Sequence, residues 1–255
     1  MNELLVVVAL VMQIQKGQPI GTATGFFYLK SDVLYFVTNR HVVIDETKGI
    51  KPDLLRVKLH TDPKDLTKNV DVDIPLYSNG SAKWHVHKDH ATKKTDIAVI
   101  ELEQKKFKTG FFIKALNSSN FLPKDLRITT GEDVIVIGFP RGVSDTEHNL
   151  PLVRNAMISS AYGIQFQGSP LFLVDANLHP GMSGSPVMTK PKDVWPDTQG
   201  GTRVFTGSPT FFLGVFSATL GVTLPTGQQE QLGLGAVWYG YLIEEIVDSF
   251  TKKKA

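Results

Sequence analysis

The sequence predicts an all-β fold in two units, followed by one helix. Short runs rich in β-branched and aromatic residues recur along the chain, and most are bounded by Gly, Pro, Asn or Asp. Many short strands at such spacing indicate a sandwich or barrels rather than alternating strands and helices. A chain of 255 residues suits one large β domain or two smaller units, and it can bury a substantial core without disulfides.

The expected strands form two groups. Residues 116–131 carry the weakest strand signal and could join the two groups, while the polar, Gly- and Pro-rich residues 189–210 are expected to form a surface excursion between strands. Strands are predicted at residues 4–14, 23–29, 33–37, 54–59, 70–76, 82–87 and 97–102, and then at 134–139, 152–160, 171–175, 185–188, 211–217 and 232–238.

The predicted helix closes the sequence. In "YGYLIEEIVDSF" apolar residues recur at helical spacing with acidic residues between them. The apolar positions are Leu242, Ile243, Ile246, Val247 and Phe250.

The apolar start, "MNELLVVVALVMQIQ", is read as a first strand. It carries Glu3 and no basic residue, whereas the n-region of a secretory signal is basic. The run is also too short to cross a bilayer, and no other segment approaches a membrane-spanning helix. We therefore expect no membrane partner.

Composition narrows the classes of function. The net charge is +2, from 27 basic and 25 acidic residues, so the chain lacks the large basic field typical of nucleic-acid binding. There are no cysteines, which excludes disulfides, thiolate metal sites and cysteine nucleophiles. A reducing cytosol is the expected compartment, although a bacterial periplasm is also compatible with this composition.

Three residues together predict nucleophilic chemistry. Ser183 lies in the turn-like "HPGMSGSP", and a serine hydroxyl becomes a useful nucleophile only with a base and a group that orients that base. His41 follows an apolar strand in "LYFVTNRHVV", and Asp96 immediately precedes one in "KKTDIAVIEL". Each residue also has a purely structural interpretation, as a turn serine, a strand-capping histidine or a strand-entry aspartate.

The order of these motifs along the chain is similar to that of a known protein family. "TNRHVV", "TDIAVIEL" and "DANLHPGMSGSPV" resemble the trypsin-like serine peptidases, most closely the HtrA-like bacterial branch without disulfides. The pattern around the nucleophile in that branch is similar to D-A-x-x-x-x-G-x-S-G-G-P. "GTATGFFYL", "GEDVIVIGFPRG" and "QLGLGAVWYGYLIEEIVD" resemble further segments of the family, so the similarity runs over nearly the whole chain.

The resemblance implies a fold and a domain plan. Two antiparallel six-stranded β-barrels with a C-terminal helix are expected within a single peptidase domain, residues 1–255. The N-terminal barrel would occupy about residues 1–115 and the C-terminal barrel with its helix about residues 130–250. No peptide-binding unit follows the helix, so the chain is expected to be either a module of a larger protein or a minimal peptidase; its oligomeric state is left open.

The resemblance also implies roles for the three residues. Ser183 would attack a peptide carbonyl, His41 would accept and return its proton, and Asp96 would orient the imidazole. The backbone N–H groups of Gly181 and Ser183 would form the oxyanion hole. The expected activity is that of a serine endopeptidase acting on a protein or peptide through an acyl-enzyme, with no cofactor and no metal.

A specificity pocket follows from the same resemblance. Because no residue of its walls is acidic, cleavage after small to medium apolar residues is expected. One wall would be Asn177, Leu178 and His179, and the other Phe216, Ser217, Ala218 and Thr219, which would pair with the substrate as an added strand.

Several alternatives remain open. Ser185 is a rival nucleophile, but only Ser183 has glycine two positions before it and one after it. The histidines of "WHVHKDH" could bind zinc, but His85 and His87 are expected to share the solvated face of an ordinary strand. A non-catalytic binding module with this fold, or a peptidase or esterase dedicated to one partner, are the alternative functions.

One departure from the family concerns activation. Digestive trypsin-like enzymes carry an aspartate just before the nucleophile, which binds a newly freed N-terminal amine. Met182 stands at that position here, so this route is unavailable. Either the oxyanion loop is preformed or another group orders it.

Overall fold

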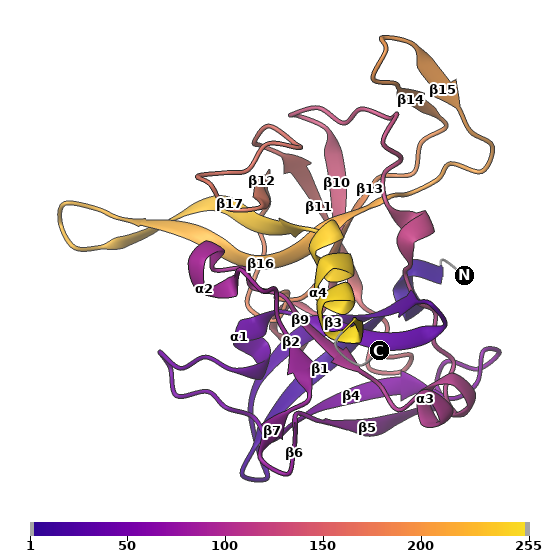
Figure 1. Cartoon of the computed structure of the whole chain (residues 1–255), viewed down its shortest axis with the longest axis vertical. Coiled ribbons are helices and arrows are strands. Elements are labelled where there is room, and N and C mark those ends of the chain that lie inside the picture. The colour runs from indigo at the N-terminus through magenta and orange to yellow at the C-terminus, as the bar shows by residue number, and fades with distance from the viewer. Residues whose placement is uncertain (1–2, 253–255) are drawn as a thin grey trace.

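Two antiparallel β units and a C-terminal helix form the molecule (Figure 1). The computed structural model describes residues 3–252. The second unit is a closed six-stranded barrel, and helix α4 (Tyr241–Thr251) packs against both units. The predicted all-β class, with a closed six-stranded barrel and a C-terminal helix, is confirmed. The N-terminal unit, for which a second six-stranded barrel was expected, is instead a seven-stranded sheet.

The N-terminal unit is a seven-stranded sheet in the order β5-β4-β1-β2-β3-β9-β8. Strands β1 and β2 form a hairpin that turns at Lys16 and Gly17, both with positive φ. The strands of this sheet are β1 Val8–Gln15, β2 Gln18–Lys30, β3 Val33–Thr38, β4 Leu54–His60, β5 Asn69–Pro75, β8 Trp84–His85 and β9 Ala98–Glu101. A small hairpin, β6 Tyr77–Ser78 with β7 Ser81–Ala82, lies between β5 and β8 in the chain.

The C-terminal barrel closes in the order β10-β11-β12-β17-β16-β13, with β13 pairing back to β10. Its strands are β10 Asp133–Gly138, β11 Leu152–Ile158, β12 Leu171–Asp175, β13 Pro186–Thr189, β16 Phe212–Thr223 and β17 Gln229–Tyr239. Strands β16 and β17 are longer than predicted, and their paired ends project from the body as a ribbon (Figure 1).

Apolar packing occurs within each unit and between them. One cluster of buried apolar side chains lies within the N-terminal unit, and a second lies inside the barrel. A third lies between the two units and includes the buried face of α4. The residues that α4 buries are those its sequence periodicity predicts: Leu242, Ile243, Ile246, Val247 and Phe250. Burying one such side chain stabilises the fold by about 1.5–3 kcal/mol, so α4 holds the two units together.

Some elements differ from the sequence-based expectations. Residues 3–6 form a 3-10 turn ahead of β1, and the stretch predicted as a surface excursion contains a hairpin, β14 Val194–Pro196 with β15 Thr202–Val204. Strand β8 has only two residues, where six were expected. Short helices not predicted from the sequence are α1 Arg40–Val43, α2 His90–Lys93 and α3 Gln104–Gly110, and 3-10 turns form at Ser118–Asn120 and Pro140–Gly142.

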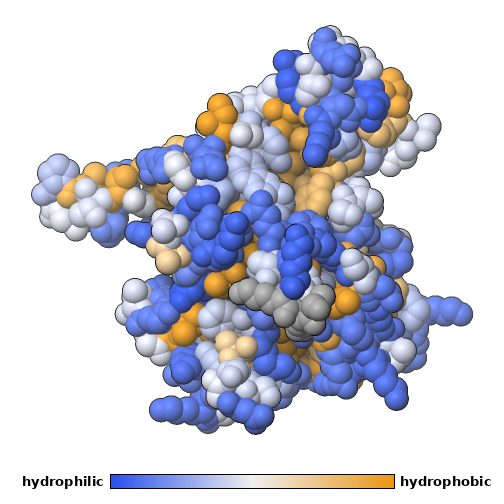
Figure 2. Space-filling model, in the orientation of Figure 1, coloured by the Kyte–Doolittle hydropathy of each residue, from blue (hydrophilic) through white to orange (hydrophobic). Residues whose placement is uncertain are grey.

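The surface is mixed in character. On the face seen in Figure 2, hydrophilic residues cover most of the area, and hydrophobic residues show as separate small areas. Within residues 3–252 no helix combines the length and the apolar content needed to cross a membrane.

Candidate active site

His41 lies in α1, the short helix that begins directly after β3. Its backbone N–H donates to Asp96 Oδ1 at 2.9 Å, and its ring Nδ1 lies 2.7 Å from Asp96 Oδ2. Because an ionised carboxylate can only accept, Nδ1 carries the hydrogen and Nε2 is left as the acceptor. The imidazole therefore has the tautomer that a general base requires.

Asp96 precedes β9 and is held by groups from two other segments, α1 with its preceding residue and β16. Besides the two bonds from His41, the Ser217 hydroxyl donates to Asp96 Oδ2 at 2.5 Å. The side-chain amide of Asn39, at the start of α1, donates to the Asp96 backbone carbonyl at 2.7 Å. The bond from Ser217 was not predicted, because no local pattern links residues so far apart in the sequence.

Ser183 lies in the turn that precedes β13, beside the same histidine. Ser183 and His41 line one cavity of 370 Å³ between the two units. The Ser183 hydroxyl donates to the backbone carbonyl of Ser217 at 2.9 Å. Among residues 3–252 no hydrogen bond joins it to His41. Two of the three predicted residues, His41 and Ser183, thus line one cavity, Asp96 is bonded to the first of them, and the Ser183 hydroxyl is turned toward Ser217.

Comparisons with known proteins show the family of the chain. Residues 23–194, more than half of the chain, match the family model of the trypsin-like peptidase domain. The chain belongs to the trypsin-like serine peptidases. No curated protein sequence matches it.

Two solved structures share the fold. One is the HtrA-type protease AlgW, solved with a tripeptide: the TM-score is 0.55 at 18% sequence identity, covering 98% of this chain and 61% of that one. The other is a serine endoprotease from Yersinia pestis, with a TM-score of 0.52 at 15% identity, covering 98% of this chain and 65% of that one. This peptidase thus spans less than two thirds of the length of either structure.

The backbone donors predicted for the oxyanion hole have no other partner. Within residues 3–252, neither the N–H of Gly181 nor that of Ser183 donates to a protein acceptor. Gly181 has φ +96°, and a Cβ there would lie 2.4 Å from the Phe139 carbonyl oxygen, so only glycine suits this position. Both N–H groups are therefore available to bind a negatively charged oxygen.

Ser185, the rival nucleophile, does not line the cavity. Its side chain is fully buried, and its hydroxyl has no hydrogen-bond partner among the described residues. A Cβ placed on Gly138 would lie only 2.1 Å from this hydroxyl, which shows how closely β10 covers it. Ser185 thus has no access to a substrate in this structure.

The cavity contains part of the predicted specificity pocket. Phe216, Ser217, Ala218, Thr219 and His179 line it as expected. Asn177 and Leu178 do not line it.

The two remaining pocket residues have other surroundings. Leu178 packs into the core of the barrel, and the Asn177 carbonyl accepts from Arg154 at 2.8 Å. The predicted wall is therefore shorter than expected, because the chain turns inward at Leu178 before reaching the cavity.

The cavity also includes a turn that the sequence did not single out. Asp45 and Lys48 follow α1 and line the side that His41 borders. The Asp45 carboxylate accepts from the Thr47 N–H and hydroxyl and lies 3.4 Å from Lys48 Nζ. These bonds, with the Thr47 hydroxyl as the main cause, lower the pKa of Asp45. Among the described residues, Asp45 is the one carboxylate that lines this cavity, and it is thus already engaged.

The histidines of "WHVHKDH" lie elsewhere, and the prediction of a solvated strand face is wrong. His87 is 4% exposed, and its Nε2 lies 2.8 Å from Glu245 of α4. The His85 ring stacks on Phe250 of α4 at 3.7 Å, and His90 Nδ1 bonds to the Thr95 carbonyl. Helix α4 covers this segment, a contact between parts of the chain that the local pattern does not reveal.

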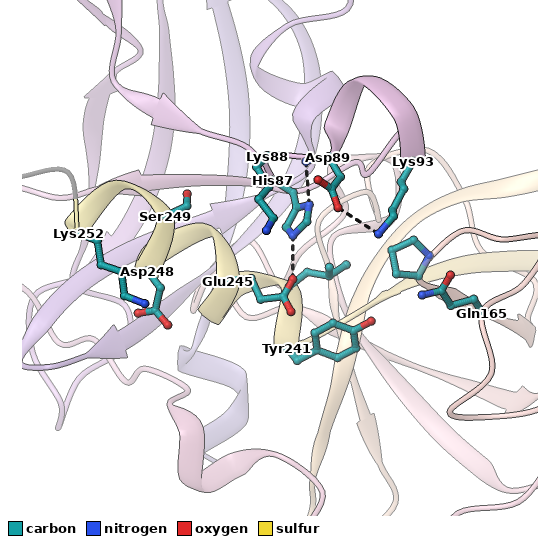
Figure 3. A pocket seen from close by; sticks show the side chains of 12 residues that line it. His87, Lys88, Asp89, Lys93, Gln165, Tyr241, Glu245, Asp248, Ser249 and Lys252 are labelled. Carbon is teal, nitrogen blue, oxygen red and sulfur yellow. Dashed lines mark hydrogen bonds and ion pairs between the residues drawn. The ribbon is translucent and has the colours of Figure 1, made fainter.

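Of these histidines, His87 borders a second, larger cavity of 620 Å³, beside α4 (Figure 3). The histidine side chains turn to separate partners, and within residues 3–252 no group of three such side chains is placed to hold a metal ion. The charged residues around this cavity are of both signs, including Lys88, Lys93, Asp89 and Glu245.

Proposed function

We propose that this chain is a serine endopeptidase that uses His41, Asp96 and Ser183 to cleave peptide bonds through an acyl-enzyme. The observation that carries the proposal is the His41–Asp96 bond, which leaves Nε2 as an acceptor at the cavity that also holds the Ser183 hydroxyl. The family membership and the free N–H groups of Gly181 and Ser183 support it.

The first step requires a small rearrangement of Ser183. Its hydroxyl donates to the Ser217 carbonyl, which lies at the start of the cavity's strand wall. A substrate that pairs with this strand can offer its own N–H to the Ser217 carbonyl. Rotation about χ1 then transfers the Ser183 hydroxyl to Nε2 of His41 and makes it a nucleophile.

The steps that follow need only the three residues, the substrate and water to supply and accept every proton. The Ser183 Oγ–carbon bond forms as the hydroxyl proton moves to His41 Nε2, and the carbonyl oxygen becomes an anion at the two N–H groups. The carbon–nitrogen bond then breaks as Nε2 returns the proton to the leaving amine. Water, deprotonated by Nε2, releases the acyl group and restores the Ser183 hydroxyl. One oxyanion donor contributes about 2.7–4 kcal/mol to such a step.

We further propose a preference for small to medium apolar residues on the acyl side of the cut bond. Within residues 3–252 the one carboxylate that lines the cavity is Asp45, and its oxygens already accept from Thr47 and Lys48. A buried Lys or Arg of the substrate would have no free partner there. Cleavage-site profiling on a peptide library tests this, and a majority of basic residues before the cut would refute it.

Labelling with a fluorophosphonate probe is the direct test of the proposed activity. Intact-mass analysis should show one adduct on the wild-type chain and none on Ser183→Ala, while Ser185→Ala should label normally. A wild-type chain that is folded but never labelled would instead support a binding module with this fold. If labelling occurs but casein survives, a dedicated partner or an ester is the substrate to seek.

A further inference from the structure

The loop that carries the oxyanion donors needs a support other than an ion pair. Met182, just before the nucleophile, has no charge and is fully buried in the core of the C-terminal barrel. The loop around it nevertheless presents two unbonded N–H groups. Some other group must fix its peptide planes.

Thr24 of β2, in the N-terminal unit, makes the contacts that do this. Its hydroxyl donates to the Gly181 carbonyl at 2.8 Å and accepts from the Phe139 N–H at 3.0 Å. Its backbone N–H donates to the Ser183 carbonyl at 2.9 Å. Thr24 is fully buried, and its own carbonyl accepts from the Thr38 hydroxyl at 2.8 Å.

The orientation of the two donors follows from which carbonyls are held. In a trans peptide the N–H points opposite to the preceding carbonyl. The Pro180 carbonyl accepts from the Arg141 N–H at 2.5 Å, so the Gly181 N–H faces away from Arg141. By the same rule the Ser183 N–H is set by the Met182 carbonyl, which accepts from the Ser185 N–H at 3.0 Å. Thr24 holds the Gly181 and Ser183 carbonyls on either side of this peptide, so the segment between them has little freedom to turn over.

The Thr24 hydroxyl is suited to this task because it donates and accepts at once. As an acceptor, the Thr24 hydroxyl binds the Phe139 N–H. Phe139 leads into the Pro140–Gly142 turn, whose Arg141 N–H binds the Pro180 carbonyl. The donor side binds Gly181. One buried hydroxyl thus joins the oxyanion loop to the turn that supports it, and it does so across the boundary between the two units.

We propose that Thr24 is a positioning residue that keeps the oxyanion loop in its donor-presenting form without an activating N-terminus. The inference rests on the proposed peptidase function. It adds that competence of the loop depends on docking of the N-terminal sheet against the C-terminal barrel.

Three variants test this. Thr24→Val keeps the shape but has no hydroxyl, and Thr24→Ser restores both hydrogen bonds. Thr189→Val is the matched control, because Thr189 is equally buried and its hydroxyl accepts from the Phe211 N–H at 2.8 Å, in the barrel and outside the cavity lining. All three are compared by thermal melting, by peptide hydrolysis and by fluorophosphonate labelling rate.

Thr24→Val should lower kcat and the labelling rate by about 10- to 100-fold, somewhat less than outright removal of an oxyanion donor, with KM changed by less than about threefold. Thr24→Ser should recover most of the rate. Thr189→Val should lower the melting temperature about as much as Thr24→Val yet keep kcat. The proposal is overturned if Thr24→Val keeps the wild-type kcat, or if Thr189→Val loses kcat to the same extent.

A measurement that needs no activity separates this proposal from the proposed function. In nitrogen-15-labelled protein, the amide resonances of Gly181 and Ser183 should shift or broaden in Thr24→Val and return in Thr24→Ser. If the wild type is neither labelled nor active, the peptidase function fails while these resonances still decide the role of Thr24. Unchanged resonances in Thr24→Val would overturn it.

Discussion

Two histidine–carboxylate pairs of nearly equal length lie at two cavities of this peptidase. His41 Nδ1 is 2.7 Å from Asp96, and His87 Nε2 is 2.8 Å from Glu245. The two pairs differ in which partner is the more exposed, the histidine in the first pair and the carboxylate in the second. In the first pair the imidazole is 35% exposed and the carboxylate 19%, whereas in the second the values are 4% and 52%.

The ring nitrogens that remain unbonded are the reason why the proposed chemistry is assigned to the first pair. His41 has one ring nitrogen bonded to a sheltered carboxylate and the other open to the cavity. Both ring nitrogens of His87 are engaged, one by Glu245 and the other by the Asp89 N–H. The larger cavity thus borders the histidine that has no nitrogen left to accept a proton. A histidine–carboxylate contact and a large cavity do not by themselves indicate catalysis.

The largest expected effect comes from removing the hydroxyl at the first pair. Ser183→Ala should lower kcat by about 10⁶-fold, since the nucleophile is lost. Ser185→Ala, which removes a buried hydroxyl away from the cavity, should retain activity. Hydrolysis of a profiled peptide measures both. Full activity in Ser183→Ala together with none in Ser185→Ala would reverse the assignment of the nucleophile.

The next largest effect is expected from replacing the carboxylate of the first pair by an amide. Asp96→Asn should lower kcat by about 10⁴-fold, because the amide no longer selects the tautomer with Nε2 free. Glu245→Gln makes the same chemical change at the second pair and should leave kcat unchanged. Equal losses in the two variants would show that both pairs serve the reaction.

Removing His87 should affect stability rather than rate. His87→Ala takes away a buried side chain with two partners and should lower the free energy of unfolding by about 1–3 kcal/mol, with kcat intact. Urea denaturation measures the free energy of unfolding, and peptide hydrolysis measures kcat. His148→Ala is the surface control: His148 is 40% exposed and paired with Asp145, so its loss should change stability little. A large fall in kcat for folded His87→Ala would contradict the comparison.

The smallest predicted change concerns the serine that supports Asp96. Ser217→Ala loses the hydrogen bond to the carboxylate but keeps the backbone carbonyl. A hydrogen bond to a charged group contributes about 1.5–3 kcal/mol, so kcat should fall by about tenfold or somewhat more. Ser249→Ala, at the second cavity, serves as the control because, among residues 3–252, its hydroxyl bonds only to the Ile246 carbonyl of its own helix. An unchanged kcat in Ser217→Ala would mean that Asp96 is oriented well enough without the Ser217 hydroxyl.

Sequence patterns predicted those features of the structure that depend on residues close together in the chain. The helical spacing of apolar residues from Leu242 to Phe250 predicts the buried face of α4, and alternation predicts most strands. The motifs around His41, Asp96 and Ser183 predict residues that do meet at one cavity or bond to one another. The two unpredicted strands of the β14–β15 hairpin have three residues each, too few for a periodic signal.

The errors occur where distant segments pack together. The alternation in "WHVHKDH" indicates a solvated face, but α4 covers it and buries His87. Leu178 is next to residues that line the cavity, yet it turns into the barrel core. No local pattern could assign either, because burial depends on which segment lies opposite.

By itself the sequence determined the β character, the closing helix and the choice of the three side chains proposed for catalysis, since periodicity and motif spacing are properties of neighbouring residues. Only the tertiary structure decided which hydrogen bonds those side chains make. It turned the Ser183 hydroxyl to the Ser217 carbonyl, directed Ser217 at Asp96 and placed Thr24 under the oxyanion loop. The physical reason is that hydrogen bonds are directional and short, so they depend on how two β units dock rather than on which residues the chain contains.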